Sequence, residues 1–196
     1  MIRRTSFIPL VLTLALGASV AAAETPWKLD RAHSSVGFSV AHYVVSEVTG
    51  KFREFDVTFV SNKDDFSDAK LSATIKVASI NTDNERRDNH LKSGDFLDAE
   101  KFPELTFVST SFEKTGEQSF DITGDLTIRG TTKEVVLHAR YKGTIENRGR
   151  TIIAFSATTE INRFDFGVKW DAKLDTGGLV AGDKISIEIT YEGLKQ

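Results

Sequence analysis

Eight segments of this chain alternate apolar and polar residues, and this two-residue period constrains the fold more than any other feature. In residues 120–128, for example, Phe120, Ile122 and Leu126 alternate with Asp121 and Asp125. Successive side chains of a β-strand point to opposite faces, so each segment predicts a strand with one apolar face that must be buried. The eight predicted strands are residues 35–42, 55–59, 71–77, 105–109, 120–128, 135–141, 153–161 and 185–191.

Short runs of turn-forming residues separate several of these strands, at 62–65, 115–117, 129–131 and 147–149. Short turns join antiparallel neighbours. Eight such strands can stack as a sandwich or close into a barrel. Closure removes the exposed edges, and eight is the strand number whose interior can hold one small ligand. We therefore predict an all-β, eight-stranded antiparallel barrel, in which a strand of about twelve residues is about 40 Å long and suits an elongated guest.

One short helix is predicted between the third and fourth strands, over Asp83–Ser93. Thr82 and Glu85 have the spacing of a capping box, and Gly94 stands where a helix ends. A helix inserted in a run of strands is a candidate lid or plug for one end of a barrel. We expect His90 to be solvated, and we expect Asp88 and Asp95 to form structural ion pairs with Arg86, Arg87 and Lys92.

Short motifs are spread over nearly the whole chain, from about Trp27 to Glu192. In chain order they are Asp30-x-x-His33-Ser34-x-Val36-x-Phe38-x-Val40-x-His42, Gly50-x-Phe52, Arg87-Asp88-x-His90-Leu91, Asp95-Phe96-Leu97-Asp98, Phe102-Pro103, Thr106-Phe107, Gly124-Asp125-Leu126-Thr127-Ile128-x-Gly130, Ile161-x-Arg163-x-Asp165-Phe166-Gly167 and Gly182-Asp183. In this order they resemble the polyisoprenoid-binding YceI-like family. The resemblance implies a lipocalin-like antiparallel barrel whose apolar interior holds a long isoprenoid or fatty chain.

Residues 1–23 have the pattern of a secretory signal peptide. Arg3 and Arg4 precede an apolar core of only ten residues, Phe7–Leu16, and three alanines end the segment at Ala23. A membrane anchor is the alternative, but this apolar run is well short of the ~20 residues that a span needs. We therefore expect export to the periplasm, with residues 24–196 forming one YceI-like lipid-binding β-barrel domain.

Charge and residue content argue against several other classes of protein. The net charge is −3, or −5 without Arg3 and Arg4, and there is no long basic run, so nucleic acid is not an expected partner. The chain has no cysteine, so no disulfide contributes to its stability. The sequence has neither the spacings of a metal site nor a Gly-x-Ser-x-Gly nucleophile motif, although it has four histidines: His33, His42, His90 and His138. We predict no metal, no cofactor and no catalysis.

The candidate site is the inside of the predicted barrel. We expect its lining to include Phe38, Val40, His42, Phe52, Phe96, Leu97, Phe107, Leu126, Phe155, Phe164, Phe166 and Trp170. For His42 the plainer alternative is a polar residue that is hydrogen-bonded at a strand end. Arg87 is the candidate contact for an anionic head group, since a guanidinium binds phosphate well. Its alternative role is to tie the helix to a carboxylate or carbonyl on the barrel rim.

Residues 163–170 are the second break in the strand pattern. If this segment is extended, one side of it carries Phe164, Phe166, Val168 and Trp170, which either cap the core or line the mouth of the cavity. We expect this segment to lie at one side of the mouth and the helix, with Phe96 and Leu97, at the opposite side. Both would then have to move when a long guest enters.

The function that this reading favours is an exported lipid-binding protein. It would hold a polyisoprenoid or another long-chain amphiphile, such as an isoprenoid quinone or its precursor, for transport or storage. One alternative is an enzyme acting on a small apolar substrate in the same barrel, which would need a nucleophile–base pair in the cavity. Another is an outer-membrane barrel, but outward-facing residues such as Lys76, Asp121 and Asp125 favour water over lipid. Transient contact with a membrane, or with a donor or acceptor protein, is compatible with this reading, and so is a homodimer.

Overall fold

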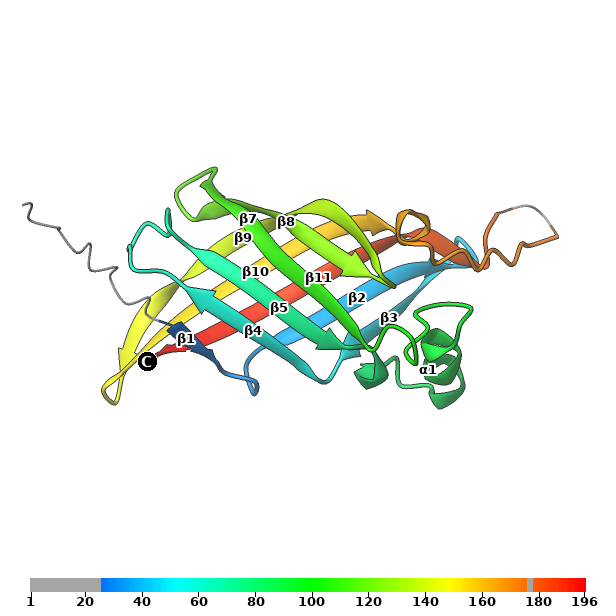
Figure 1. Ribbon diagram of the computed structural model, residues 1–196, viewed down its shortest axis with the longest axis horizontal. Coiled ribbons are helices and arrows are strands. Elements are labelled where there is room, and N and C mark those ends of the chain that lie inside the picture. Colours follow the sequence, from blue (N-terminus) through cyan, green and yellow to red (C-terminus); the bar gives the residue numbers. More distant parts are fainter. Residues whose placement is uncertain (1–25, 176–177) are drawn as a thin grey trace, which may run out of the picture.

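The computed structural model describes residues 26–175 and 178–196, which form strands wound around one long axis, with one α-helix at one end (Figure 1). The predicted signal peptide, residues 1–23, lies outside the described residues. The strands are β1 (Pro26–Leu29), β2 (Ser35–His42), β3 (Ser46–Phe52), β4 (Phe55–Val60), β5 (Lys70–Lys76), β6 (Ile80–Asn81), β7 (Glu104–Lys114), β8 (Ser119–Ile128), β9 (Thr131–Asn147), β10 (Arg150–Asn162) and β11 (Ala181–Lys195). The helical elements are α1 (Glu85–Lys92) and the short 3-10 helices η1 (Val77–Ser79) and η2 (Arg163–Phe166). Among the described residues, no helix is both long and apolar enough to span a membrane.

The strands close into a barrel because β1 pairs with both β4 and β11. β1 and β2 are two parts of one bent barrel strand, since both pair with β11. In the same way β3 and β4 form the second barrel strand, and β5 with β6 forms the third. Together with β7 to β11 this makes an antiparallel ring of eight barrel strands, with α1 between the third and the fourth. The predicted fold class is confirmed.

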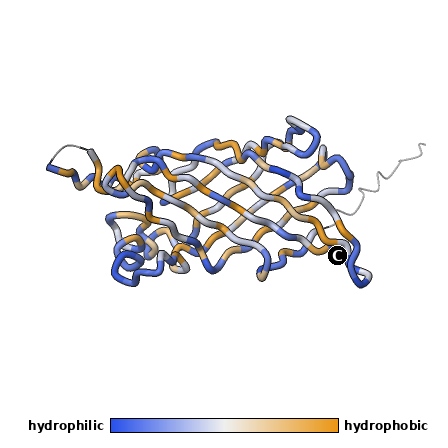
Figure 2. The backbone as a smooth tube through the Cα atoms, turned by 180° about the vertical axis from the view of Figure 1, so that it is seen from behind, coloured by the Kyte–Doolittle hydropathy of each residue, from blue (hydrophilic) through white to orange (hydrophobic). Residues whose placement is uncertain are grey.

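Strand β8 shows how the alternation in the sequence becomes a barrel wall. Its Phe120, Ile122 and Leu126 side chains are buried, whereas Asp125 is exposed. Leu126 pairs with Phe107 on β7, whose side chain is also buried. Apolar and hydrophilic positions alternate along the strands around the barrel (Figure 2). The period of two therefore puts one apolar face inside the barrel and one polar face in water, with the register that the sequence predicts.

The end of the barrel away from α1 is filled by aromatic rings. Neighbouring ring centroids lie 5.2–6.5 Å apart in this group, which we call the aromatic plug: Phe59, Phe66, Phe112, Phe120, Tyr141, Phe155 and Tyr191. Tilted and edge-on ring pairs at such distances are attractive beyond the apolar area they bury. The plug therefore closes one end of the barrel with densely packed core.

Phe66 belongs to the plug although it lies in the loop between β4 and β5. The loop is folded around Asp68, whose carboxylate accepts hydrogen bonds from Ser61 Oγ at 2.8 Å, Asn62 N at 3.1 Å and Lys63 N at 3.2 Å. These bonds also lower the pKa of Asp68, the one from Ser61 most. Phe66 has a positive φ of 59° and is buried against five other rings. The sequence showed only a turn here, so the loop's contribution to the core is a finding of the structure.

Helix α1 begins and ends differently from the prediction. Its N-cap is Asn84, whose side chain accepts a hydrogen bond from Arg87 N at 3.0 Å, so the predicted capping box of Thr82 and Glu85 is wrong. The left-handed φ of 56° at Asp83 turns the chain between Thr82 and the helix. Thr82 is buried and bonds to the Asp88 carboxylate through its backbone N at 2.9 Å and its Oγ1 at 2.5 Å. Asp88 thus pairs with Thr82 rather than with a neighbouring cation.

Candidate ligand-binding cavity

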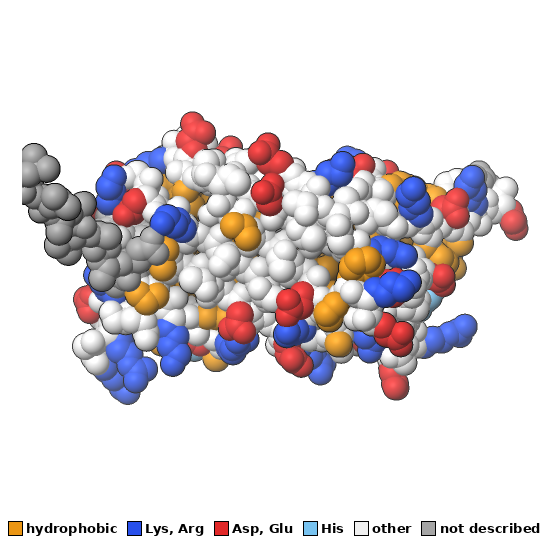
Figure 3. Space-filling model, viewed as in Figure 1, with side chains coloured by type: hydrophobic (Ala, Val, Ile, Leu, Met, Phe, Trp, Pro, Cys, Tyr) orange, Lys and Arg blue, Asp and Glu red, His pale blue; other side chains and the backbone are white. Residues whose placement is uncertain are grey.

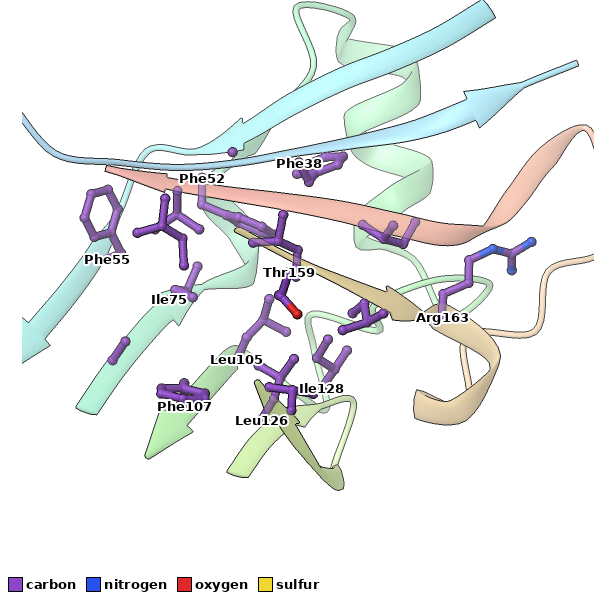
Figure 4. Close-up of a pocket in the computed structure, with 18 of the residues that line it drawn as sticks. Phe38, Phe52, Phe55, Ile75, Leu105, Phe107, Leu126, Ile128, Thr159 and Arg163 are labelled. Carbon is purple, nitrogen blue, oxygen red and sulfur yellow. The ribbon is translucent and has the colours of Figure 1, made fainter. Parts of the chain in front are cut away.

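The inner faces of the barrel strands enclose a cavity of about 360 Å³. Its walls are almost entirely apolar, and Phe38, Phe52, Leu105 and Ile128 are among the side chains that point into it (Figure 4). The cavity extends from Phe59, Phe112, Phe155 and Tyr191 of the aromatic plug to side chains near α1 and η2. Its volume lies within the range of small-molecule sites, and its lining suits a guest that makes few hydrogen bonds.

Most of the residues that the sequence proposed as lining do line this cavity. They are Phe38, Val40, His42, Phe52, Phe96, Leu97, Phe107, Leu126, Phe155, Phe166 and Trp170, and Arg87 reaches it as well. Their contact with a ligand stays a prediction.

Phe164 is the exception, and its assignment to the lining was wrong. Residues 163–166 form the 3-10 helix η2 instead of an extended segment, so the side chains do not alternate between two faces. The ring of Phe164 lies under the guanidinium of Arg163, 4.3 Å from ring centroid to Cζ, whereas Phe166 is buried against the core.

The sequence reasoning also left out many lining residues. The inward faces of the later strands supply Leu137, Ile161, Ile185, Ile187 and Ile189, and Val180 and Ala181 line the cavity just before and at the start of β11. The strand alternation could have identified the first group, because they occupy the apolar face of predicted strands. Val180 and Ala181 follow no such pattern.

Thr159 puts a polar group into the apolar wall. It lies on β10 between the inward-facing Ala157 and Ile161, and its oxygen points into the cavity (Figure 4). Among the described residues, no hydrogen-bond partner reaches this hydroxyl. A guest that fills the cavity displaces water and would leave this hydroxyl without a hydrogen bond. A guest with an oxygen within reach of the hydroxyl would therefore bind better than a pure hydrocarbon.

Arg87 sits on the first turn of α1 and is held within its own segment. Its Nε donates to Thr82 Oγ1 and its Nη2 to the Thr82 carbonyl oxygen, both at 2.8 Å. Thr82 in turn bonds to Asp88, so three side chains lock the start of the helix onto the preceding turn. The guanidinium is thus oriented by a hydroxyl and a carbonyl, and among the described residues no carboxylate lies within ion-pair distance of it.

Arg163 is the other guanidinium at the edge of the cavity, and it is buried, with 5% of its surface exposed. It donates hydrogen bonds to three carbonyl oxygens: Gly182 at 2.8 Å, Val168 at 2.8 Å and Ala181 at 3.0 Å. Burial lowers the pKa of Arg163 below its usual value, but an arginine side chain stays charged in proteins. Arg163 therefore fastens η2 and the chain after it to the start of β11.

The helix segment and the aromatic segment meet across the mouth of the cavity. The ring of Trp170 lies 5.2 Å from that of Phe96 and 5.6 Å from that of His90, measured between centroids. His90 also bonds to Asp95 through Nε2 at 3.0 Å. The two segments, predicted at opposite sides of the mouth, are thus in contact, while His90 stays exposed, as the sequence predicts.

A second group of ionisable side chains lies outside the cavity. The potential ligand atoms of Asp30, His33 and Glu192 lie within 4.8 Å of one another, and none of the three residues lines the cavity. His33 Nδ1 is 3.1 Å from Asp30, and this hydrogen bond raises the pKa of His33 and lowers that of Asp30. His33 is largely exposed, so the simplest role of the group is to fasten the turn before β2 to β11.

Comparison with known proteins gives one consistent family. A model of the YceI-like domain matches residues 27–193. A UPF0312 protein from Staphylococcus aureus strain MSSA476 is 39% identical over 170 residues, which are 86% of this chain and 96% of that protein. A UPF0312 protein from strain N315 matches to the same extent.

Solved structures resemble this one over most of the barrel. The YCEI protein of Campylobacter jejuni has a TM-score of 0.69 at 35% identity, with 86% of this chain and 97% of that chain covered. Burkholderia cenocepacia BcnA has a TM-score of 0.71 at 23% identity, covering 84% and 99%. A domain from Saccharophagus degradans described as polyisoprenoid-binding has a TM-score of 0.62 at 12% identity, covering 87% and 98%. The last two share the fold with this chain.

Proposed function

The chain belongs to the YceI-like family, and on that premise we propose that it is an exported protein that holds a polyisoprenoid or another long-chain amphiphile in its barrel for transport or storage. The observation that carries the proposal is the cavity, which is apolar along its walls, filled by aromatic rings at one end and bordered by Phe96 and Trp170 at the other. A long apolar chain is the guest that fits a lining of this kind.

The energetics of apolar burial suggest what such a cavity can select. Each buried CH₂ contributes ~0.8 kcal/mol, so a chain of about thirty carbons would exceed any realistic affinity if all of it were buried. Selection by chain length must then come from the depth between the mouth and the aromatic plug. Selection between guests with different polar groups must come from the few polar side chains of the lining. Two of these are Thr159, within the wall, and Arg87, at the mouth.

Two further points support this function. The Saccharophagus degradans domain of the same fold is described as polyisoprenoid-binding, which makes an isoprenoid the first guest to test here. Residues 1–23 have the pattern of a secretory signal, which supports the proposed export to the periplasm.

Catalysis in the same barrel is the weaker candidate. Nucleophilic catalysis needs a hydroxyl within hydrogen-bond reach of a base. The lining serine and threonines are Ser156, Thr159 and Thr190, and among the described residues none of their hydroxyls bonds to a histidine. This arrangement favours binding over chemistry.

The test is to purify the protein from its own cells without detergent and to analyse it by native mass spectrometry, with extraction of any bound lipid. We expect a discrete mass increase that matches an isoprenoid or another long-chain amphiphile. A guest-free protein that also fails to take up a fluorescent isoprenoid in vitro would overturn the proposal. Asp125→Lys, on the outer face of β8, is the matched control for variants inside the cavity.

A further inference from the structure

The hairpin between β2 and β3 exposes three consecutive apolar side chains. Tyr43 is 46% exposed, Val44 73% and Val45 87%. The hairpin lies at the same end of the barrel as α1, which is the end with the cavity mouth (Figure 1). Few other large apolar side chains are so exposed among the described residues, and Val108 and Ile145 lie elsewhere, on β7 and β9.

These residues do not suit the turn that they form. Val45 N donates to His42 O at 3.3 Å across the turn, and the two central residues have left-handed backbones, with φ of 52° at Tyr43 and 64° at Val44. A β-turn whose two central residues both have positive φ favours asparagine and glycine there, and a β-branched residue is strained. Local turn formation therefore does not explain the bulky apolar side chains at this tip, and such departures are expected where a residue serves a function.

The apolar tip is continuous with the inside of the barrel. The centroid of the Tyr43 ring lies 3.9 Å from that of His42, which lines the cavity, with the two rings tilted by 46°. Tyr43 N donates to the carbonyl oxygen of Val180 at 3.0 Å, and Val180 and the following Ala181 line the cavity as well. The exposed tip therefore adjoins the lining of the cavity at its rim.

We propose that the Tyr43–Val45 tip docks on the surface of a lipid bilayer, with the cavity mouth turned toward the lipid. Valines inserted below the head groups, with a tyrosine at the interface, are a favourable arrangement. The inference rests on the proposed function in so far as the guest is a membrane lipid. A guest leaving the bilayer would then enter the cavity at the rim beside the tip instead of crossing water.

The size and charge of the tip favour lipid over other partners. Three exposed side chains are far fewer than the 20–30 residues that each side of a standard protein interface contributes. The neighbouring stretch before β11 carries Lys169 and Lys173 but also Asp171 and Asp175, so it has no excess of positive charge. Both signs of charge are present on the visible surface at this end of the molecule (Figure 3). Zwitterionic lipid should therefore suffice, with little dependence on salt.

The first experiment measures binding of the guest-free protein to phosphatidylcholine vesicles by co-sedimentation. Val44→Gly should lower the vesicle affinity about tenfold, because one inserted valine is lost. Since glycine suits the turn, the thermal midpoint should stay the same or rise, so unfolding cannot explain the loss. Val108→Gly and Ile145→Ser, at exposed apolar positions away from the tip, should leave vesicle binding unchanged. Equal vesicle binding by Val44→Gly and the wild type would overturn the proposal.

The second experiment separates docking from guest binding. A fluorescent isoprenoid is supplied either from cyclodextrin or from phosphatidylcholine vesicles. Val44→Gly should take up the guest normally from cyclodextrin but several-fold more slowly from vesicles. If the wild type binds no guest from either source, the proposed function fails, while the vesicle co-sedimentation still decides the docking. A wild-type dimer in sedimentation velocity that Val44→Gly dissociates would assign the tip to a second copy of the chain and overturn docking on lipid.

Discussion

The two ends of the barrel are built in different ways. The end with the aromatic plug is closed by rings that pack against one another. Phe59 contacts four of these rings and is only 2% exposed. At the mouth, a short helix and a 3-10 helix are held by hydrogen bonds to hydroxyl and carbonyl oxygens. Trp170, which joins the two sides of the mouth, is only half-buried.

This difference predicts that the two ends of the barrel have different roles, one in stability and the other in guest exchange. Segments whose apolar side chains stay partly exposed, as Leu97 and Trp170 do at the mouth, open at lower free-energy cost than the fully buried core does. The aromatic plug should therefore carry much of the stability, and the mouth should open for the guest. The comparison fails if both ends respond alike to substitution.

The largest effect is expected in the wall that joins the two ends. Leu126→Asp puts an unpaired carboxylate into the apolar cavity, and burying such a charge is very unfavourable. We expect loss of lipid retention and of cooperative unfolding, measured by circular dichroism. Asp125→Lys, one residue away and exposed, should be tolerated. Similar behaviour of the two variants would mean that the two faces of β8 are not distinct.

A truncation in the aromatic plug should cost stability before it affects guest exchange. Phe59→Ala removes contacts with Phe66, Phe112, Phe155 and Tyr191 and should lower the free energy of unfolding by about 3–5 kcal/mol. Val108→Ala, on the outer wall, should change it by less than about 0.5 kcal/mol. Urea titration measures both. If Phe59→Ala lowers the free energy of unfolding by less than about 1 kcal/mol, the aromatic plug does not carry much of the stability.

A truncation at the mouth should affect guest release more than it affects stability. Trp170→Ala and Phe96→Ala break the contact across the mouth, so release of a fluorescent isoprenoid should be several-fold faster, at a smaller loss of stability than for Phe59→Ala. Phe166, which is 2% exposed, should instead behave as core when truncated. Stopped-flow release, measured beside the urea midpoint, separates the two effects. Unchanged release with a large loss of stability would identify Trp170 and Phe96 as ordinary core as well.

The smallest expected effect concerns the chemistry of the guest. Thr159→Val keeps the shape of the side chain and removes its hydroxyl. Affinity for an isoprenoid that carries an oxygen within reach should fall about fivefold, as for the loss of one hydrogen bond. Affinity for a pure hydrocarbon such as squalene should not fall, which makes squalene the control. Equal changes for both ligands, measured by displacement of a fluorescent probe, would show that Thr159 does not contact the guest.

The sequence by itself determined the barrel and its register. Alternation with a period of two is a local property, so each strand could be located without knowing its neighbours, and Leu126 could be placed inside and Asp125 outside. The helix between the third and fourth strands followed from the break in that pattern. The predicted lining residues on strands, such as Phe38, Phe107 and Phe155, do line the cavity for the same reason.

Only the tertiary structure decided how the two ends are made. Nothing in the sequence around Phe66 distinguishes a loop phenylalanine from one that fills a barrel, because its five ring partners lie on other segments. The contact between Phe96 and Trp170 likewise joins residues far apart in the chain. The wrong prediction for Phe164 arose because a 3-10 helix and an extended segment can have the same apolar residues, and hydrogen bonds from Arg163 to distant carbonyls favour the helix. Contacts between distant segments leave no local period in a sequence, and the mouth and the plug are built from such contacts.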